Sequence, residues 1–194
     1  MNKRCVALSE EEYKESILLL RSGFELEGSV VRPNERIATI AVLQATLGIR
    51  LGDTLKLRMS SFIKDGNRYR LDIKEEKTGK MRVFTVPMEV YSFLQGYAIS
   101  QGIGYEARFF PISERQVQRH LKKVFQKMGL PDKKYGSHSY RKFFATKIYQ
   151  DNDMNIELVR ILLQHSSVAT TQRYIGICQK TVENALIGTI KHLV

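Results

Sequence analysis

The stretch from residue 136 to residue 174 constrains the fold most, because it combines charged and apolar helical patterns over a short span. His138 and Arg141 are three positions apart and therefore share one face of a helix. An Arg guanidinium matches phosphate oxygens, and a His side chain exchanges a proton near neutral pH, so this face predicts a phosphate-binding site. A second histidine, His165, is followed nine residues later by Tyr174. An apolar stripe on the adjoining face consists of Tyr140, Phe144 and Ile148. This stripe predicts that the helix packs against the core.

Two segments upstream extend the pattern. TLGIRLGDTLKL carries Arg50 and Asp53 just after an expected helix end, and KTGKMRVFTVP carries Lys77 at the bend of an expected hairpin. With HSYR and LLQHSSVATTQRY, the chain resembles the tyrosine recombinases, the phage-integrase type of DNA breaking and rejoining enzymes, from about residue 34 to residue 174. Their pattern is an early Arg, a hairpin Lys, His-x-x-Arg, Leu-Gly-His and Thr-x-x-Tyr. All blocks occur here in that order, with Gln164, Tyr140 and Asp53 in place of the usual Gly, Leu and Glu.

The resemblance implies a role for each of these residues in cleaving a phosphodiester bond. A Tyr hydroxyl has an ordinary pKa of about 10 and is a poor nucleophile unless neighbouring cations assist it. Tyr174 would attack the scissile phosphate and form a 3′-phosphotyrosyl link, so no ATP, metal or other cofactor would be needed. The remaining roles would be phosphate contacts for Arg50, Arg141 and His165, protonation of the leaving 5′-oxygen by Lys77, acceptance of the Tyr174 proton by His138, and support by Asp53.

A metal site is the alternative interpretation of the two histidines. His138 and His165 could both serve as metal ligands, but no Cys lies near them and neither has closely spaced ligand partners. The sequence therefore favours no metal site.

The charge of the chain indicates a polyanionic partner, and double-stranded DNA is the partner that the resemblance implies. The formal net charge is +11, and residues 114–150 carry ten Lys or Arg against two acidic residues, whereas residues 1–29 have a net charge of −2. Within residues 113–128, basic side chains recur every four residues on the face opposite an apolar one. This basic stripe predicts a helix that follows a DNA backbone, and it consists of Arg115, Arg119, Lys123 and Lys127.

Local signals predict a mixed α+β fold that is mainly helical, with a small antiparallel sheet. Ser9 and Glu12 form a capping box that opens a helix, and Asn34 caps a helix that ends at Gly48. Residues 68–73 and 81–86 have strand character and predict a β-hairpin. We interpret residues 23–33 as a loop. Helices are also expected from residue 90 to about residue 102, from residue 113 to residue 128, after Asn155, and from residue 179 to residue 194.

The length of 194 residues predicts one domain, the family's catalytic domain, over residues 1–194 and without the amino-terminal DNA-clamping domain that the family usually adds. Such a chain is either a fragment of a longer integrase or a short stand-alone recombinase. Cys5 and Cys178 provide no disulfide framework, and neither a signal peptide nor an apolar run of about 18 residues is present. These features predict a cytoplasmic, nucleoid-associated protein with no membrane contact.

Three functions remain open at this point. The first is site-specific recombination or integration by a homo-oligomer, a tetramer on DNA, with the tail of residues 179–194 packed either on its own domain or on a neighbour. The second is DNA relaxation of the type IB topoisomerase kind, which uses the same chemistry without paired protomers. The third is a catalytically silent DNA-binding regulator, which would not need all six of the catalytic candidates.

Overall fold

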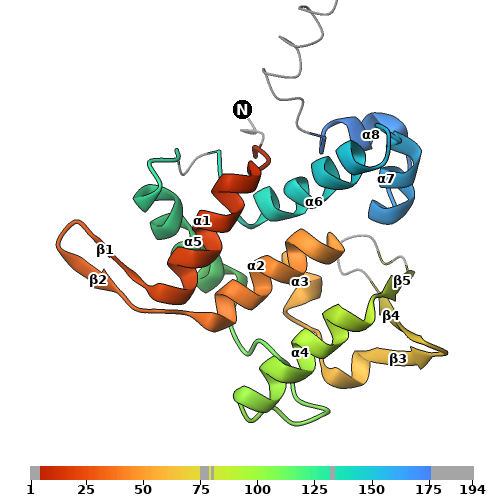
Figure 1. The fold of residues 1–194 in the computed structure, drawn as a ribbon, viewed down its shortest axis with the longest axis horizontal. Helices are drawn as coiled ribbons and strands as arrows, with labels where there is room; N and C mark the ends of the chain where they lie inside the picture. The colour runs from red at the N-terminus through yellow and green to blue at the C-terminus, as the bar shows by residue number, and fades with distance from the viewer. Residues whose placement is uncertain (1–4, 75–78, 80, 132–133, 176–194) are drawn as a thin grey trace, which may run out of the picture.

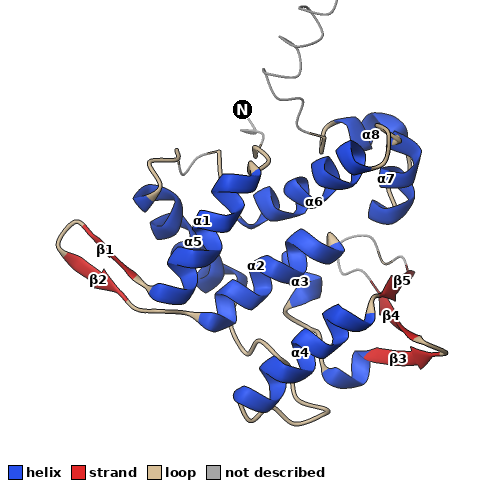
Figure 2. Ribbon diagram, viewed as in Figure 1, coloured by secondary structure: helices blue, strands red, loops and turns tan. Residues whose placement is uncertain are grey.

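The computed structural model describes residues 5–74, 79, 81–131 and 134–175. The helices in this part of the chain are α1 (Glu10–Ser22), α2 (Glu35–Leu47), α3 (Leu51–Thr54), α4 (Met88–Ser100), α5 (Glu114–Lys127), α6 (Ser137–Asp151), α7 (Ile156–Leu163) and α8 (Val168–Gln172), with a 3-10 turn at Met59–Ser61. The strands are β1 (Phe24–Leu26), β2 (Ser29–Val31), β3 (Phe62–Asp65), β4 (Arg68–Lys74) and β5 (Met81–Val86). The expected class, mainly helical with a small antiparallel sheet, is confirmed (Figure 2).

Two separate antiparallel sheets are present among the described residues. Strands β3, β4 and β5 form one sheet in that order, and the β4–β5 pairing runs from Tyr69 opposite Val86 to Lys74 opposite Met81. The predicted hairpin is therefore confirmed, although Lys77 at its bend lies outside the described residues. The second sheet is the β1–β2 hairpin, and the interpretation of residues 23–33 as a loop is wrong for this segment. Its two strands have only three residues each, too few for an alternating pattern to stand out.

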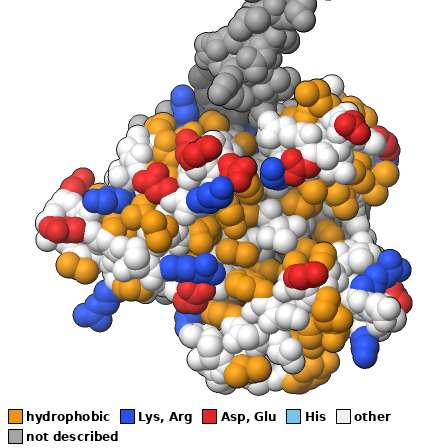
Figure 3. Space-filling view, in the orientation of Figure 1, with side chains coloured by type: hydrophobic (Ala, Val, Ile, Leu, Met, Phe, Trp, Pro, Cys, Tyr) orange, Lys and Arg blue, Asp and Glu red, His pale blue; other side chains and the backbone are white. Residues whose placement is uncertain are grey.

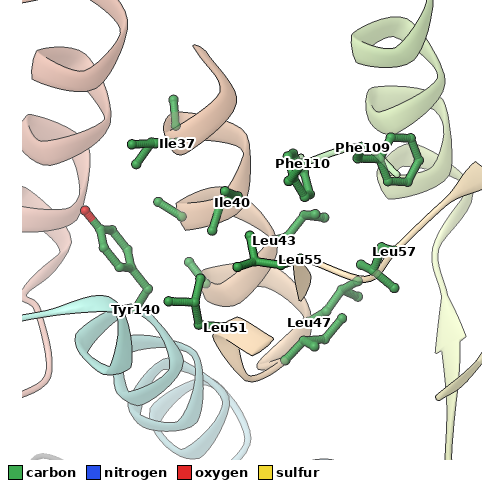
Figure 4. Close-up of a cluster of buried hydrophobic side chains, with 14 of the residues drawn as sticks. Ile37, Ile40, Leu43, Leu47, Leu51, Leu55, Leu57, Phe109, Phe110 and Tyr140 are labelled. Carbon is green, nitrogen blue, oxygen red and sulfur yellow. The ribbon is translucent and has the colours of Figure 1, made fainter. Parts of the chain in front are cut away.

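Helix α2 lies at the centre of the molecule. In Figure 1 it runs between α1, α5 and the β1–β2 hairpin on one side and α4 with the β3–β4–β5 sheet on the other. Nine of its 13 residues are buried, which is why its sequence is apolar on nearly all sides. Figure 4 shows Ile40 and Leu43 of α2 between Tyr140 of α6 and the aromatic pair Phe109 and Phe110.

A second, smaller apolar cluster joins α6 to α7. It contains Phe144, Ala145, Val159 and Leu163, and Tyr174 packs against it. Helices α6, α7 and α8 lie together at one side of the molecule in Figure 1. Helices α6 and α7 and the segment that follows them carry His138, Arg141, His165 and Tyr174, so their contact with Gly48 at the end of α2 decides how the site is assembled.

The expected helix ends are confirmed where side-chain caps mark them. Ser9 and Ser113 both form capping boxes, and Asn34 accepts a hydrogen bond from the backbone N–H of Ile37 at 3.1 Å. Gly48 ends α2 in the left-handed conformation, with φ of 60°. The positive φ of Gly48 therefore turns the chain out of α2 and toward Arg50.

Acidic side chains gather on α1 and the β1–β2 hairpin, as the composition of residues 1–29 indicates. Figure 3 shows these acidic groups over α1 and at the tip of the hairpin, and they include the exposed Glu10, Glu11, Glu25 and Glu27. Basic residues of the predicted stripe lie on α5, where all four side chains are exposed.

Candidate active site

Arg141 lies at the centre of the candidate site and is completely buried, with no exposed surface. Its guanidinium donates to the backbone carbonyl of Gly48 through Nη1 and to that of Leu163 through Nη2, the second at 3.4 Å. These carbonyls lie at the carboxyl ends of α2 and α7, where the helix dipole is negative. Arg141 therefore ties two helix ends together as well as facing the site.

Gly48 makes this contact possible because nothing larger fits. A Cβ atom at this position would lie 2.4 Å from Cδ1 of Phe144 and 3.2 Å from Cδ2 of Leu163. The end of α2 therefore meets α6 and α7 by close backbone approach, and the Gly48 carbonyl reaches Arg141.

Tyr174 is surrounded by cations and imidazole rings. The guanidinium carbon of Arg141 lies 5.6 Å from the centre of the Tyr174 ring, and Nζ of Lys142 lies 5.9 Å from it. The centre of the His165 ring is 4.6 Å away and that of His138 is 6.2 Å away. Cations and hydrogen-bond donors around a tyrosine can stabilise the negative charge that develops when it attacks a phosphate, so the geometry suits a nucleophilic tyrosine.

His165 is held by interactions at both its backbone and its ring. The residue is only 6% exposed, and its Nδ1 lies 3.1 Å from the hydroxyl of the buried Thr171. The Arg160 guanidinium donates to the His165 carbonyl at 2.9 Å. The preceding Gln164 adopts the left-handed conformation with φ of 50°. Glycine, the usual residue at this position in the pattern described above, adopts that conformation without steric strain. Gln164 therefore adds backbone strain at this turn.

Arg50 and His138 line the same pocket, which has a volume of about 290 Å³. Arg50 is the amino-terminal cap of α3, a short helix that the sequence did not predict, and the Thr54 hydroxyl donates to the Arg50 carbonyl at 2.9 Å. Asp53 also lines this pocket and is 3% exposed. Residues more than eighty positions apart in the chain thus meet around a space that could accept a phosphate.

Helix α5 contributes a wall of this pocket through Gln118, a residue that the sequence did not single out. The Gln118 amide donates to the Ser137 hydroxyl at 2.7 Å and accepts from the Ser137 backbone N–H at 3.4 Å. Ser137 is the first residue of α6 and directly precedes His138. The contact therefore links the basic helix α5 to the start of the helix that carries His138 and Arg141.

Lys142 is the second residue that sequence reasoning missed. In the sequence it is one of the ten Lys or Arg of residues 114–150, but in the structure its Nζ lies over the Tyr174 ring and donates to the Arg173 carbonyl at 2.7 Å. Its position directly after Arg141 was the available signal. Tyr140, by contrast, is fully buried in the main core, and burial raises the pKa of its hydroxyl far above the usual range. Tyr140 is therefore unsuited to act as a nucleophile.

The structure thus gathers Arg141, His165, His138 and Tyr174, and it brings Arg50 and Asp53 to the pocket beside His138. Lys77 lies outside the described residues. No group of three or more His, Cys, Asp or Glu side chains that could hold a metal ion is found among the described residues. None of the described helices has the length and apolar character that crossing a bilayer requires.

Comparison with known proteins gives a consistent result. A model of the phage integrase family matches residues 32–180. The chain is 27% identical to the probable integrase/recombinase YoeC of Bacillus subtilis, covering 83% of this chain and 88% of that protein. It is 25% identical to the tyrosine recombinase XerH of Campylobacter jejuni, covering 86% of this chain and 47% of that protein. A tyrosine recombinase XerC of Bradyrhizobium diazoefficiens is 30% identical over 81% of this chain and 50% of its own length. The chain therefore spans about half the length of these two relatives.

Solved structures show the same fold. XerH bound to a palindromic difH substrate, in a post-cleavage complex, superposes with a TM-score of 0.70 at 20% identity, covering 98% of this chain and 54% of that one. The XerA recombinase superposes with a TM-score of 0.66 at 22% identity, covering 99% and 65%. The catalytic domain of bacteriophage HP1 integrase has a TM-score of 0.62 at 17% identity, with 94% of each chain covered.

Proposed function

This chain belongs to the phage integrase family, and we propose that it acts as a site-specific DNA recombinase that breaks and rejoins strands through Tyr174. The observation that carries the proposal is the position of the Tyr174 ring between the Arg141 guanidinium, Nζ of Lys142 and the rings of His138 and His165. Three residues that the sequence motifs single out, His138, Arg141 and His165, therefore lie around the ring of a fourth, Tyr174.

The proposed cleavage step conserves the bond energy of the DNA strand. The Tyr174 oxygen forms a bond to the scissile phosphorus, its proton passes to His138, and the bond from phosphorus to the 5′-oxygen breaks. Lys77 supplies the proton that the leaving 5′-oxygen takes up. Arg50, Arg141 and His165 hold the non-bridging oxygens through charge-assisted or neutral hydrogen bonds, which stabilise the charge that develops in the transition state. Asp53, at the Arg50 end of the pocket, supports that geometry.

Rejoining is the reverse of this step. A free 5′-hydroxyl attacks the phosphotyrosine and releases Tyr174. Exchange of strands requires a 5′-hydroxyl from a second duplex, so recombination requires paired protomers, and we propose a homotetramer on chromosomal DNA. The exposed stripe Arg115, Arg119, Lys123 and Lys127 on α5 would contact the DNA backbone.

The test is a covalent trapping assay on nicked duplexes drawn from a pool that contains the DNA flanking the gene. The reaction is quenched in detergent, and mass spectrometry maps the linked residue. We expect a 3′ adduct on Tyr174 that disappears in Tyr174→Phe, while DNA binding stays nearly unchanged because only one hydroxyl is lost. Tyr149→Phe is the matched control, since Tyr149 packs against the same apolar cluster, and it should form the adduct normally.

The rival functions give different results in the same assay. Adducts that remain in Tyr174→Phe would refute the nucleophile. Adducts accompanied by relaxation of supercoiled plasmid, without any paired complex of two duplexes, would favour a topoisomerase-like activity. Binding that is sensitive to salt but never gives an adduct would favour the silent regulator.

A further inference from the structure

The basic stripe on α5 is not uniform once the fold is formed. Arg119 and Lys123 line a pocket of about 380 Å³ between α5 and the start of α2, whereas Arg115 and Lys127 are not among its lining residues. His120 lies between the two cations in sequence and also lines this pocket. The other polar walls are Gln116 of α5 and Asn34 at the start of α2.

Positive charge in this pocket is not balanced by the protein. No acidic side chain lines it. The nearest acidic residue in sequence, Glu35, is held by Arg21, whose Nε lies 3.3 Å from a Glu35 carboxylate oxygen. Neither Arg119 nor Lys123 forms an ion pair with any residue in the described part of the chain. Two unpaired cations one helical turn apart leave a local positive potential.

His120 supplies an independent observation. Its Nε2 atom is buried and has no hydrogen-bond partner among the described residues. A buried polar nitrogen without a partner is unfavourable, so such atoms usually bind a ligand or an ordered water. Burial, together with the nearby Lys123, lowers the pKa of His120. An anion in the pocket would accept a hydrogen bond from His120 and offset both effects.

We propose that this pocket, lined by Arg119, His120 and Lys123, is a second phosphate-binding site that holds a backbone phosphate of the bound DNA away from the scissile bond. The proposal rests on the proposed function, because it takes DNA as the partner. The Arg119 guanidinium would donate to the two non-bridging oxygens of this phosphate. The Lys123 ammonium and Nε2 of His120 would donate to the same oxygens from other directions.

The pocket lies at the opposite end of α2 from the carbonyl that Arg141 binds. Helix α2 has 13 residues and joins the pocket, at Asn34, to Gly48, whose carbonyl binds Arg141. At a rise of 1.5 Å per residue this is about 20 Å, which corresponds to about six base pairs along the axis of B-DNA. One rigid helix therefore sets the spacing between the two phosphate sites.

The stripe offers a matched pair of variants to test the pocket. Arg119→Gln/Lys123→Gln removes two charges from the pocket, and Arg115→Gln/Lys127→Gln removes two charges from the same helix outside it. Duplex affinity is measured for both over a series of salt concentrations. We expect the pocket pair to lose a contact to one phosphate, so that the slope of log affinity against log salt falls by about 0.9. The control pair should lower the slope as well, because Arg115 and Lys127 belong to the stripe proposed to contact the DNA backbone, and His120 then distinguishes the two pairs. All four side chains are exposed, so both variants should unfold at the same temperature as the parent.

The NMR resonances of His120 distinguish binding in the pocket from non-specific attraction between the basic stripe and DNA. The ring nitrogens of His120 are followed by NMR as duplex is added, and in a separate arm as inorganic phosphate is added. We expect duplex to shift the Nε2 resonance and raise the pKa of His120 in the parent and in the control pair, but not in the pocket pair. Unchanged His120 resonances on addition of duplex, or a shift with duplex that persists in the pocket pair, would overturn the proposal. A shift with inorganic phosphate and none with duplex would also overturn it.

Failure of the pocket can be distinguished from failure of the proposed function. Adduct formation at Tyr174 is scored separately, at saturating DNA. Normal adducts without any His120 response would reject the pocket alone. A His120 response to duplex without adducts would retain the pocket and reject the recombinase chemistry.

Discussion

Replacing Gly48 by alanine tests whether the close approach between α2 and α6 assembles the site. The added Cβ would lie 2.4 Å from Cδ1 and 2.6 Å from Cε1 of Phe144, and 3.2 Å from Cδ2 of Leu163. All three atoms belong to helices that pack around Tyr174. Because the Gly48 carbonyl accepts from Arg141, any movement that relieves the clash also moves this acceptor.

The expected loss of stability has two parts. Gly48 has φ of 60°, and an L-residue in this left-handed region costs about 1–2 kcal/mol. Displacing the Phe144 ring in a packed cluster adds about 1–3 kcal/mol. The total is about 2–5 kcal/mol, a large share of the 5–15 kcal/mol that typically stabilises a domain of about this size.

Gly102→Ala is the control that isolates the clash. Gly102 has φ of 62°, but a Cβ there would meet nothing within 4 Å, so this variant carries the conformational cost alone. Urea unfolding of both variants should give a difference of about 1–3 kcal/mol, with Gly48→Ala the less stable. At a temperature where both are folded, only Gly48→Ala should also cleave DNA more slowly. Equal losses of stability would refute the argument that this glycine is required by close packing.

Three further predictions concern neighbouring features. Gln164→Gly should raise the free energy of unfolding by about 0.5–1 kcal/mol, because relief of the left-handed strain exceeds the entropy that glycine adds to the unfolded chain, and Gln164→Ala should show no such gain. Thr171→Val should lower the free energy of unfolding by about 1–3 kcal/mol, because Nδ1 of the buried His165 loses its hydroxyl partner. The same variant should form the DNA adduct more slowly without binding DNA more weakly. An unchanged rate of adduct formation would contradict this role of Thr171. Because the pKa of His120 is lowered in the fold, His120 contributes stability above its unfolded value of about 6.5, and that contribution is lost as pH falls through the folded value. Unfolding measured at successive pH values should show this loss in the parent and a flatter profile in His120→Gln.

Local signals predicted the helices and the main hairpin because they act within a few residues. Capping side chains at Ser9, Asn34 and Ser113 and the glycine at position 48 satisfy or end the backbone hydrogen bonds of their own helices, so their effect does not depend on distant contacts. The β1–β2 hairpin has no such signal, since each strand is three residues long. The four-residue helix α3 is likewise too short for a helical period to appear.

The candidate site was predictable in its residue types but not in its supporting contacts. Motif spacing pointed to His138, Arg141, His165 and Tyr174, and the structure brings these four together. The hydrogen bond from Gln118 to Ser137 joins α5 to α6. The hydrogen bond between Thr171 and His165 depends on the tight turn between α7 and α8. Neither can be read from periodicity, because each requires the relative placement of elements that only packing determines.

The environment of His120 was also not predictable from the sequence. In sequence it is one more polar residue between Arg119 and Lys123 on a basic helix, where a solvated position is the ordinary expectation. In the structure its Nε2 atom is buried, and the residue lines a pocket together with Asn34 at the start of α2. The chemical interest of the residue therefore comes from a tertiary contact and could not have been inferred from the helical pattern.

Arg141 combines a structural role with its proposed chemical role, and the two follow from the same contacts. It binds the carbonyls of Gly48 and Leu163, and the chain then reaches Arg50 two residues after the first and His165 two residues after the second. A single buried guanidinium thus contacts the starting points of the two segments that carry Arg50 and His165, the other proposed phosphate ligands. A lysine at this position could not reproduce the planar fork that reaches both carbonyls. The preference for arginine therefore follows from the assembly of the site as much as from the affinity of guanidinium for phosphate.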